Sequence, residues 1–89
     1  MKPTIGRIVQ YVATQSDKEK MEAAKQVNGG CNQADILPGI VVAVHGEDKV
    51  NLRVLADGNL ILWKTNVLWG KEPGMWHLME HVVNPFVKL

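Results

Sequence analysis

Aromatic and imidazole side chains gather near the end of this 89-residue sequence. The stretch EPGMWHLMEH, residues 72–81, places Trp76 and His77 after a Pro-Gly turn and His81 four residues beyond the first imidazole. On a helix, this i, i+4 spacing would put both imidazoles on one face, where they could bind a metal ion. The stretch lacks the HExxH order of zinc proteases, and no third ligand is apparent. We therefore expect no metal site, with His77 packed or hydrogen-bonded and His81 solvated.

Other catalytic arrangements are also missing from the sequence. Hydrolysis needs a nucleophile with a base in reach, paired carboxylates, or a metal ion with three or more ligands. The carboxylates of Glu47, Asp48 and Asp57 fall in predicted turns, where such residues are common for backbone reasons alone. Residues 29–30, Gly-Gly, follow a predicted helix and do not open one, so they predict no phosphate-binding loop. The sequence thus predicts a protein that is not an enzyme and that uses no cofactor.

Three tryptophans, Trp63, Trp69 and Trp76, favour a binding surface. The core of so small a domain is thin and cannot easily enclose all three indoles. If Leu62 faces inward, Trp63 lies on the opposite face, near Arg53 of the neighbouring strand. An indole beside a guanidinium can stack a base or receive a side chain of a partner protein. The same face could instead be buried against other copies of the chain.

Composition limits the classes of partner. Ten Lys and Arg residues against nine Asp and Glu give a net charge of +1, which argues against binding to duplex nucleic acid. Two or three cations could still hold a small anionic ligand. No apolar run approaches the ~20 residues that span a bilayer, and the N-terminus lacks the pattern of a secretory signal. We expect a cytoplasmic protein with no membrane partner and with Cys31 as an inert thiol.

One helix is expected early in the chain. Residues 4–13 are rich in β-branched side chains and predict a first strand, with a bend or bulge at Gly6. The following SDKEKMEAAKQVNGG predicts a helix that Ser16 and Glu19 cap and that residues 28–30 end. Its apolar side is narrow, so we expect a surface helix with the charge run of residues 17–20 in solvent.

Short strands dominate the sequence from Ile36 onward. Residues 38–39, Pro-Gly, predict a turn into a central strand over residues 40–44. Residues 50–54 alternate between apolar and polar, which predicts a strand with one face in solvent. The Asp-Gly pair at 57–58 predicts a hairpin, and the return strand could break near residues 65–66. Residues 76–83 fit helical spacing, and Pro85 would end any helix there.

These elements predict the fold class. Four or five short strands on one chain of this length cannot form a two-sheet sandwich with a full core. We expect a single domain over residues 1–89 that is mainly β. It would be a small, strongly bent sheet or SH3-like barrel with one short helix inserted after the first strand and a short C-terminal helical segment.

Several stretches of the sequence resemble, in order, segments of a widespread group of small phage-encoded proteins. The stretches are KPTIGRIVQYV, VNLRVLADGN leading to LWKTNV, and EPGMWH. The pattern of the group runs Pro-Thr-Ile/Val-Gly-Arg-Ile-Val-His-Tyr, Val-Asn-x-x-Val-x-x-Asp-Gly-Asn, Trp-x-Thr-x-Val and Pro-Gly-Thr-Trp-His-Trp-Pro. The resemblance covers most of the chain outside the helix and VNGGCNQAD. The sequence departs from it at Gln10, where the pattern has His, and at residues 78–79, where Leu-Met replaces Trp-Pro.

The resemblance implies an anti-CBASS sponge, which is an oligomeric β-rich protein that sequesters a cyclic oligonucleotide defence signal without cleaving it. A homo-oligomer would then hold the nucleotide at sites shared between protomers. The residues expected to contact it are Arg7, Arg53 and Lys64 at phosphates, Tyr11, Trp63 and Trp76 as stacking rings, and Asn51, Thr65 and His77 at base edges. The alternative is an SH3-like protein-interaction module that binds a host or phage protein through the same aromatic face.

Overall fold

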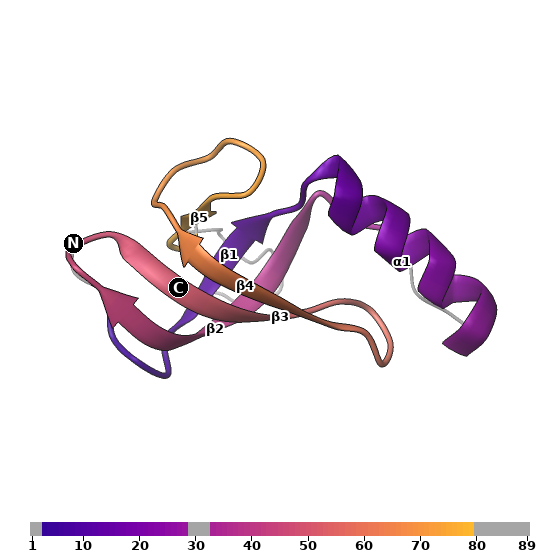
Figure 1. The fold of residues 1–89 in the computed structure, drawn as a ribbon, viewed down its shortest axis with the longest axis horizontal. Helices are drawn as coiled ribbons and strands as arrows, with labels where there is room; N and C mark the ends of the chain where they lie inside the picture. The colour runs from indigo at the N-terminus through magenta and orange to yellow at the C-terminus, as the bar shows by residue number, and fades with distance from the viewer. Residues whose placement is uncertain (1–2, 29–32, 80–89) are drawn as a thin grey trace, which may run out of the picture.

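The computed structural model describes residues 3–28 and 33–79 and shows an antiparallel sheet with one helix (Figure 1). The elements follow the order β1 (Ile8–Val12), α1 (Gln15–Asn28), β2 (Ile36–His45), β3 (Lys49–Leu55), β4 (Ile61–Val67) and β5 (Trp76–His77). The mainly β class and the helix after the first strand are confirmed.

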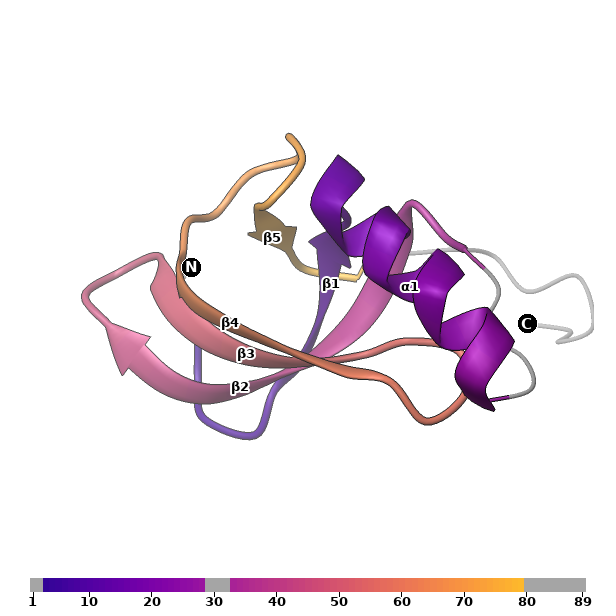
Figure 2. The same ribbon diagram turned by 45° about the vertical axis from the view of Figure 1, so that its right-hand side comes forward.

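The sheet has five strands in the order β4-β3-β2-β1-β5 and is strongly bent (Figure 2). Strand β2 lies in the middle, as its apolar sequence on both faces predicts. Beyond β4 the chain turns toward β5, where Trp76 N donates to Leu68 O at 3.0 Å and Gly70 N donates to Trp76 O at 2.7 Å. These bonds bring the two ends of the sheet toward each other without closing a barrel.

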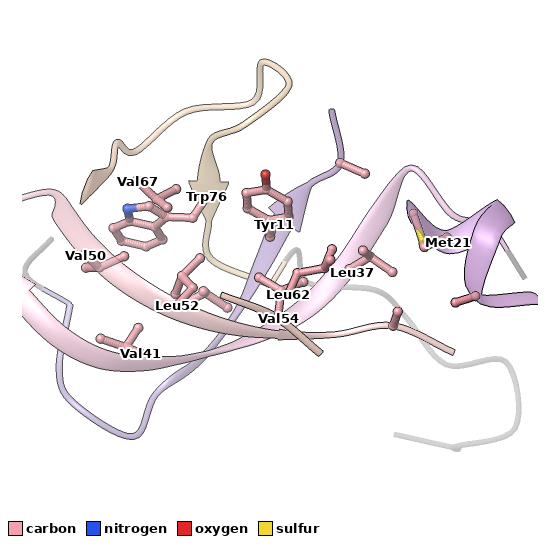
Figure 3. Packing of buried hydrophobic residues seen from close by; sticks show 14 residues of the cluster. Tyr11, Met21, Leu37, Val41, Val50, Leu52, Val54, Leu62, Val67 and Trp76 are labelled. Carbon is pink, nitrogen blue, oxygen red and sulfur yellow. The ribbon is translucent and has the colours of Figure 1, made fainter. Parts of the chain in front are cut away.

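The core occupies the inner, concave face of the sheet (Figure 3). The alternation predicted for β3 is confirmed, because Val50, Leu52 and Val54 all point inward with 0% exposure. Burial of each such side chain contributes roughly 1.5–3 kcal/mol to stability. Tyr11 of β1 and Trp76 of β5 pair directly across the two strands and are the largest side chains of this core. A thin domain thus uses two aromatic rings to fill its interior.

The expected C-terminal helical segment is wrong at its start. Trp76 and His77 form the short strand β5 beside β1, and the Trp76 indole Nε1 donates to Asp48 O at 2.7 Å. Trp76 is buried in the sheet, whereas Met79, which was expected on the same helical face, is 60% exposed. The rest of that predicted segment, from residue 80 on, lies outside the described residues.

The cap of the helix lies two residues before Ser16, the cap that the sequence predicts, and the helix begins at Gln15. Thr14 Oγ1 accepts a hydrogen bond from Asp17 N at 3.1 Å, and Asp17 Oδ2 accepts one from Thr14 N at 3.0 Å. This reciprocal pair is a capping box with Asp in place of Glu, so Thr14 and not Ser16 caps the helix. Ala13 N donates to Asp35 O at 2.8 Å, so the chain returns to the sheet at the place where the helix leaves it.

Two strand boundaries also differ from the sequence expectation. The first strand starts at Ile8, because Arg7 N donates to Thr4 O at 3.1 Å in a turn where Gly6 has a φ of 90°. The predicted Pro38-Gly39 turn is wrong, since both residues lie inside β2 and pair with Gln10 and Val9. Gly39 does not have the positive φ that a type II Pro-Gly turn requires.

Candidate binding surface

Four of the predicted contact residues meet on the outer, convex face of β3 and β4. Because Leu62 points into the core, Trp63 points away from it, and Arg53 does the same beside the buried Leu52. Arg53 and Trp63 are direct partners in the β3–β4 register. We call these four outward residues of β3 and β4 the outer patch, which consists of Asn51, Arg53, Trp63 and Thr65.

A cation–π pair stands at the centre of the outer patch. The Arg53 guanidinium carbon lies 5.6 Å from the centroid of the Trp63 ring, within the range of this interaction. Trp63 is 53% exposed, and Arg53 is also exposed. The pair therefore offers an aromatic surface and a positive charge side by side, as the sequence predicts.

Asn51 and Thr65 flank this pair at one end. Asn51 Oδ1 accepts a hydrogen bond from Asn66 N at 3.0 Å, where Asn66 has a φ of 54° and the β3–β4 register shifts. The predicted irregularity near residues 65–66 is thus present, although β4 continues to Val67. In this hydrogen bond Asn51 uses its side-chain carbonyl oxygen as the acceptor. Its side-chain amide nitrogen, which is a donor, takes no part in the bond.

Apolar side chains continue the outer face toward β1 and at the end of the patch away from Asn51 and Thr65. Their exposed fractions are 52%, 41%, 37% and 50%, and they belong to β1, β2, β3 and β4 respectively. We call this group the aliphatic rim, and it consists of Ile8, Ile36, Leu55 and Ile61. Together with Trp63, the rim leaves five large apolar side chains between 37% and 53% exposed, and exposed apolar surface of this kind marks interaction sites.

Tyr11 and Trp76 are misassigned as stacking rings. Each is 1% exposed and fills the core, so neither ring has a free face for a base. Both residue types are large and apolar enough to dominate a small core, which is the reason that sequence patterning did not separate them from Trp63. Their role within the protomer is structural.

Lys64 also points to the inner side of the sheet, where it pairs with the buried Asp17. Its ammonium forms an ion pair with Asp17 Oδ1 and lies 5.8 Å from the centroid of the Tyr11 ring. The Tyr11 hydroxyl donates to the other carboxylate oxygen, Asp17 Oδ2, at 2.7 Å. We call Tyr11, Asp17 and Lys64 the inner polar cluster. The phosphate role predicted for Lys64 does not fit, because its charge is already paired with an anion that is 0% exposed.

The environment of the inner polar cluster fixes its protonation. Burial tends to raise the pKa of Asp17, but hydrogen bonds from Lys64, Thr14 and Tyr11 outweigh burial and hold that pKa below its ordinary value. Burial, together with the bond to Asp17 and the charge of Asp17, raises the pKa of Tyr11 well above its ordinary value. Asp17 is therefore a carboxylate and Tyr11 a neutral phenol at neutral pH. Asp17 was expected in a solvated charge run, and the Thr14-x-x-Asp17 spacing is the signal that marks it as a capping residue.

The last two predicted residues lie away from the outer patch. Arg7 is exposed in the turn before β1, and its backbone carbonyl accepts a hydrogen bond from Val41 N at 2.9 Å. His77 belongs to β5, at the opposite end of the sheet from β4, is 6% exposed, and has its Nδ1 2.9 Å from Leu78 O. A buried imidazole does not offer an edge to a base, so the structure does not support His77 as a base reader.

Two general features of the described residues bear on the kind of ligand. Within residues 3–28 and 33–79, no three His, Cys, Asp or Glu side chains are placed to hold a metal ion. In the same ranges, no helix has both the length and the apolar character to cross a bilayer.

Comparison with known proteins gives no match. No family model fits the chain, and neither a curated protein nor a solved structure resembles it at a significant level. The resemblance to phage-encoded sponges therefore stays a prediction.

Proposed function

We propose that this chain is a binding protein that captures a small anionic nucleotide on its outer patch without cleaving it. The observation that carries the proposal is the exposed Arg53–Trp63 pair on the sheet surface. A base can stack on the indole while the guanidinium neutralises a phosphate, and both contacts tolerate a range of nucleotides. Asn51 and Thr65 lie on the same face, where an amide and a hydroxyl can read the edge of the stacked base.

The sequence resemblance narrows the class of nucleotide. A cyclic oligonucleotide defence signal combines bases with phosphates that lack a free terminus, and capture without cleavage would remove it from a host cell's alarm pathway. The outer patch supports this proposal by supplying a stacking ring and a cation next to each other. The proposed contact set thus shrinks to Asn51, Arg53, Trp63 and Thr65.

One protomer provides a platform rather than a pocket. The core lies on the concave side of the bent sheet, so the outer patch sits on the convex side (Figure 3). Sites for small molecules are usually concave and enclose most of the ligand surface. A nucleotide on this face therefore needs a second wall, which supports the proposal that sites are shared between protomers.

A protein-interaction module is the second candidate function. The aliphatic rim favours it, because Ile8, Ile36, Leu55 and Ile61 would contact few atoms of a nucleotide but suit the apolar centre of a protein interface. An exposed Trp beside an Arg is also a common centre of binding energy in such interfaces.

Nucleotide binding can be tested on the purified full chain. We expect protein prepared without added ligand to show excess absorbance at 260 nm, and cyclic dinucleotides to raise its melting temperature. At a hundred times the dissociation constant, the ligand adds about 2.7 kcal/mol of apparent stability. Trp63→Ala should abolish this gain.

Trp69→Ala is the matched control, because Trp69 is 60% exposed but lies beyond β4 and outside the outer patch. This variant should keep the gain in melting temperature. A clean protein spectrum together with no thermal response to any cyclic nucleotide would contradict the proposal and favour the protein-interaction module.

A further inference from the structure

The strand that carries Trp63 forms an edge of the sheet. Strand β4 is the first strand in the order β4-β3-β2-β1-β5 and pairs only with β3. Among the described residues, no backbone hydrogen bond joins residues 61–67 to a segment other than β3. An edge of this kind presents a row of backbone donors and acceptors on which another strand can pair.

The regular part of this edge is centred on Trp63. Asn66 has a φ of 54° and coincides with the shift in the β3–β4 register, so the extended part of the strand is residues 61–65. Trp63 is the middle residue of that range. An antiparallel pair of two identical strands has its two-fold axis at one residue, and here the longest regular overlap places the axis at Trp63.

Few of the features that usually prevent such pairing act on residues 61–65 of the edge. This range contains no proline, and the irregularity at Asn66 lies beyond it. Its one charged side chain, Lys64, points inward, which is a feature that can protect an edge, but here the charge is paired with Asp17. On the outer face the edge presents Ile61 and Trp63, which are 50% and 53% exposed. The side chains therefore leave the backbone of this strand open to a partner and add apolar contacts to the pairing.

We propose that two copies of the chain pair antiparallel through β4, with Trp63 opposite Trp63, and that the resulting two-fold site binds a cyclic dinucleotide. This inference rests on the proposed function and names its ligand class. The two indoles lie side by side on one face, and the two Arg53 side chains flank them one strand further out. Across the four strands of the dimer, the side chains on this face are therefore a cation, two aromatic rings and a second cation. A ligand with two bases and two phosphates related by two-fold symmetry presents the complementary groups.

Spacing and charge favour this register over its neighbours. Adjacent strands lie about 4.8 Å apart, so the two Arg53 Cα atoms are separated by three strand spacings, about 14 Å, which their long side chains can bridge toward a ligand between them. An axis at Lys64 would place two ammonium groups opposite each other, whereas an axis at Trp63 places Lys64 opposite Leu62.

Engineered disulfides test the register directly. With the axis at Trp63, residue 61 of one copy lies opposite residue 65 of the other, at a Cα separation of about 4.5–5.5 Å that a disulfide can span. In a Cys31→Ser background, Ile61→Cys combined with Thr65→Cys should give a covalent dimer on oxidation. The two single-cysteine variants are controls and should not crosslink. In this register, residue 61 of one copy is far from residue 61 of the other, and the same holds for residue 65. Within one strand the two cysteines are too distant to react with each other.

Light scattering and calorimetry complete the test on the unmodified chain. The expected results are a dimer or a multiple of it, and cyclic di-AMP or cyclic di-GMP bound at about one ligand per two chains. Each should bind about tenfold or more tightly than AMP, since it engages two rings.

The outcomes separate the two proposals. A monomer at micromolar concentration, or a folded double-cysteine variant that does not crosslink, overturns the pairing even if one nucleotide binds per chain, and that binding would uphold the proposed function. If the double-cysteine variant crosslinks but the unmodified chain binds none of the nucleotides, the proposed function and the shared site are overturned, while the β4 pairing itself is upheld.

Discussion

Replacement of Lys64 by Met is expected to destabilise the fold by about 3 kcal/mol. Met has a similar length, but it removes the ammonium that pairs with Asp17 and lies over the Tyr11 ring. The Asp17 side chain is 0% exposed, so its charge loses the cation without gaining water. Loss of one partner from a buried ion pair costs roughly 3–5 kcal/mol. We take the low end because the Lys64 side chain is 21% exposed and the pair is partly screened.

Replacement of the acidic partner, Asp17, by Asn is expected to cost less stability than Lys64→Met. In Asp17→Asn the unpaired ammonium of Lys64 can turn toward solvent, so the loss is limited to the capping and Tyr11 hydrogen bonds, about 1–2 kcal/mol. The double variant Asp17→Asn with Lys64→Met should therefore be more stable than Lys64→Met alone, because it removes the buried unpaired charge.

Urea unfolding of the four proteins, followed by circular dichroism, measures these differences at constant m value. The pKa of Asp17 is lowered in the folded protein, so its contribution is present above the unfolded carboxyl pKa of about 3.9 and is lost as the pH falls through the folded value. The gap between wild type and Lys64→Met should accordingly narrow in acid. A double variant less stable than Lys64→Met would refute the argument that an orphaned carboxylate causes the loss.

Three further sets of measurements test the assignments of core, cluster and cap. Trp76→Ala should cost about 3–5 kcal/mol because the ring is 1% exposed, whereas Trp63→Ala, at 53% exposed, should cost about 1 kcal/mol; thermal melts in the opposite order would show that core and surface are interchanged. The raised pKa of Tyr11 means that the folded protein retains a proton that the unfolded chain loses above about pH 10, so wild-type stability should fall there. Tyr11→Phe should lose about 1 kcal/mol of stability at neutral pH, but its melting temperature should not show this fall at alkaline pH. Thr14→Ala should cost about 1 kcal/mol and Ser16→Ala close to nothing, and equal losses on chemical unfolding would mean that Thr14 is not the cap.

Local patterning predicted the meander of the sheet. The period-two pattern of Val50, Leu52 and Val54 requires one buried face, and all three side chains are buried. The Asp57-Gly58 pair requires a tight turn, and Gly58 has a φ of 103°. The alternation of the two strands places Trp63 and Arg53 on the same face, which was predictable from short-range signals. Their direct pairing was not, because a two-residue turn at 57–58 would place Arg53 opposite Leu62, whereas the loop of residues 56–60 places it opposite Trp63.

Contacts between distant segments were not predictable in the same way. Lys64 alternates correctly onto the inner face, but no local rule indicates that the helix start brings Asp17 to it. Trp76 follows a turn, and the residues beside it in the sequence do not indicate which way its ring points. Only the pairing of Trp76 with β1 decides that the ring enters the core. Tyr11 shares that pairing. A free aromatic ring and a buried one have the same sequence signature until the non-local strand partner is known.

Strands β1 and β2 pair as a hairpin, and the hydrogen bond from Ala13 N to Asp35 O extends that pairing. The helix is therefore part of the connection between the two strands of this hairpin. The helix is needed as far as Ala24, because Asp17, Met21 and Ala24 are buried in the core cluster or beside it. Because the sheet already holds Ala13 and Asp35 together, residues added after Ala24 would lengthen a connection whose ends are fixed. Doubling the length of such a loop costs only about 0.6 kcal/mol. This position can therefore accept a longer segment or a whole grafted domain while the outer face, on the strands, keeps its geometry.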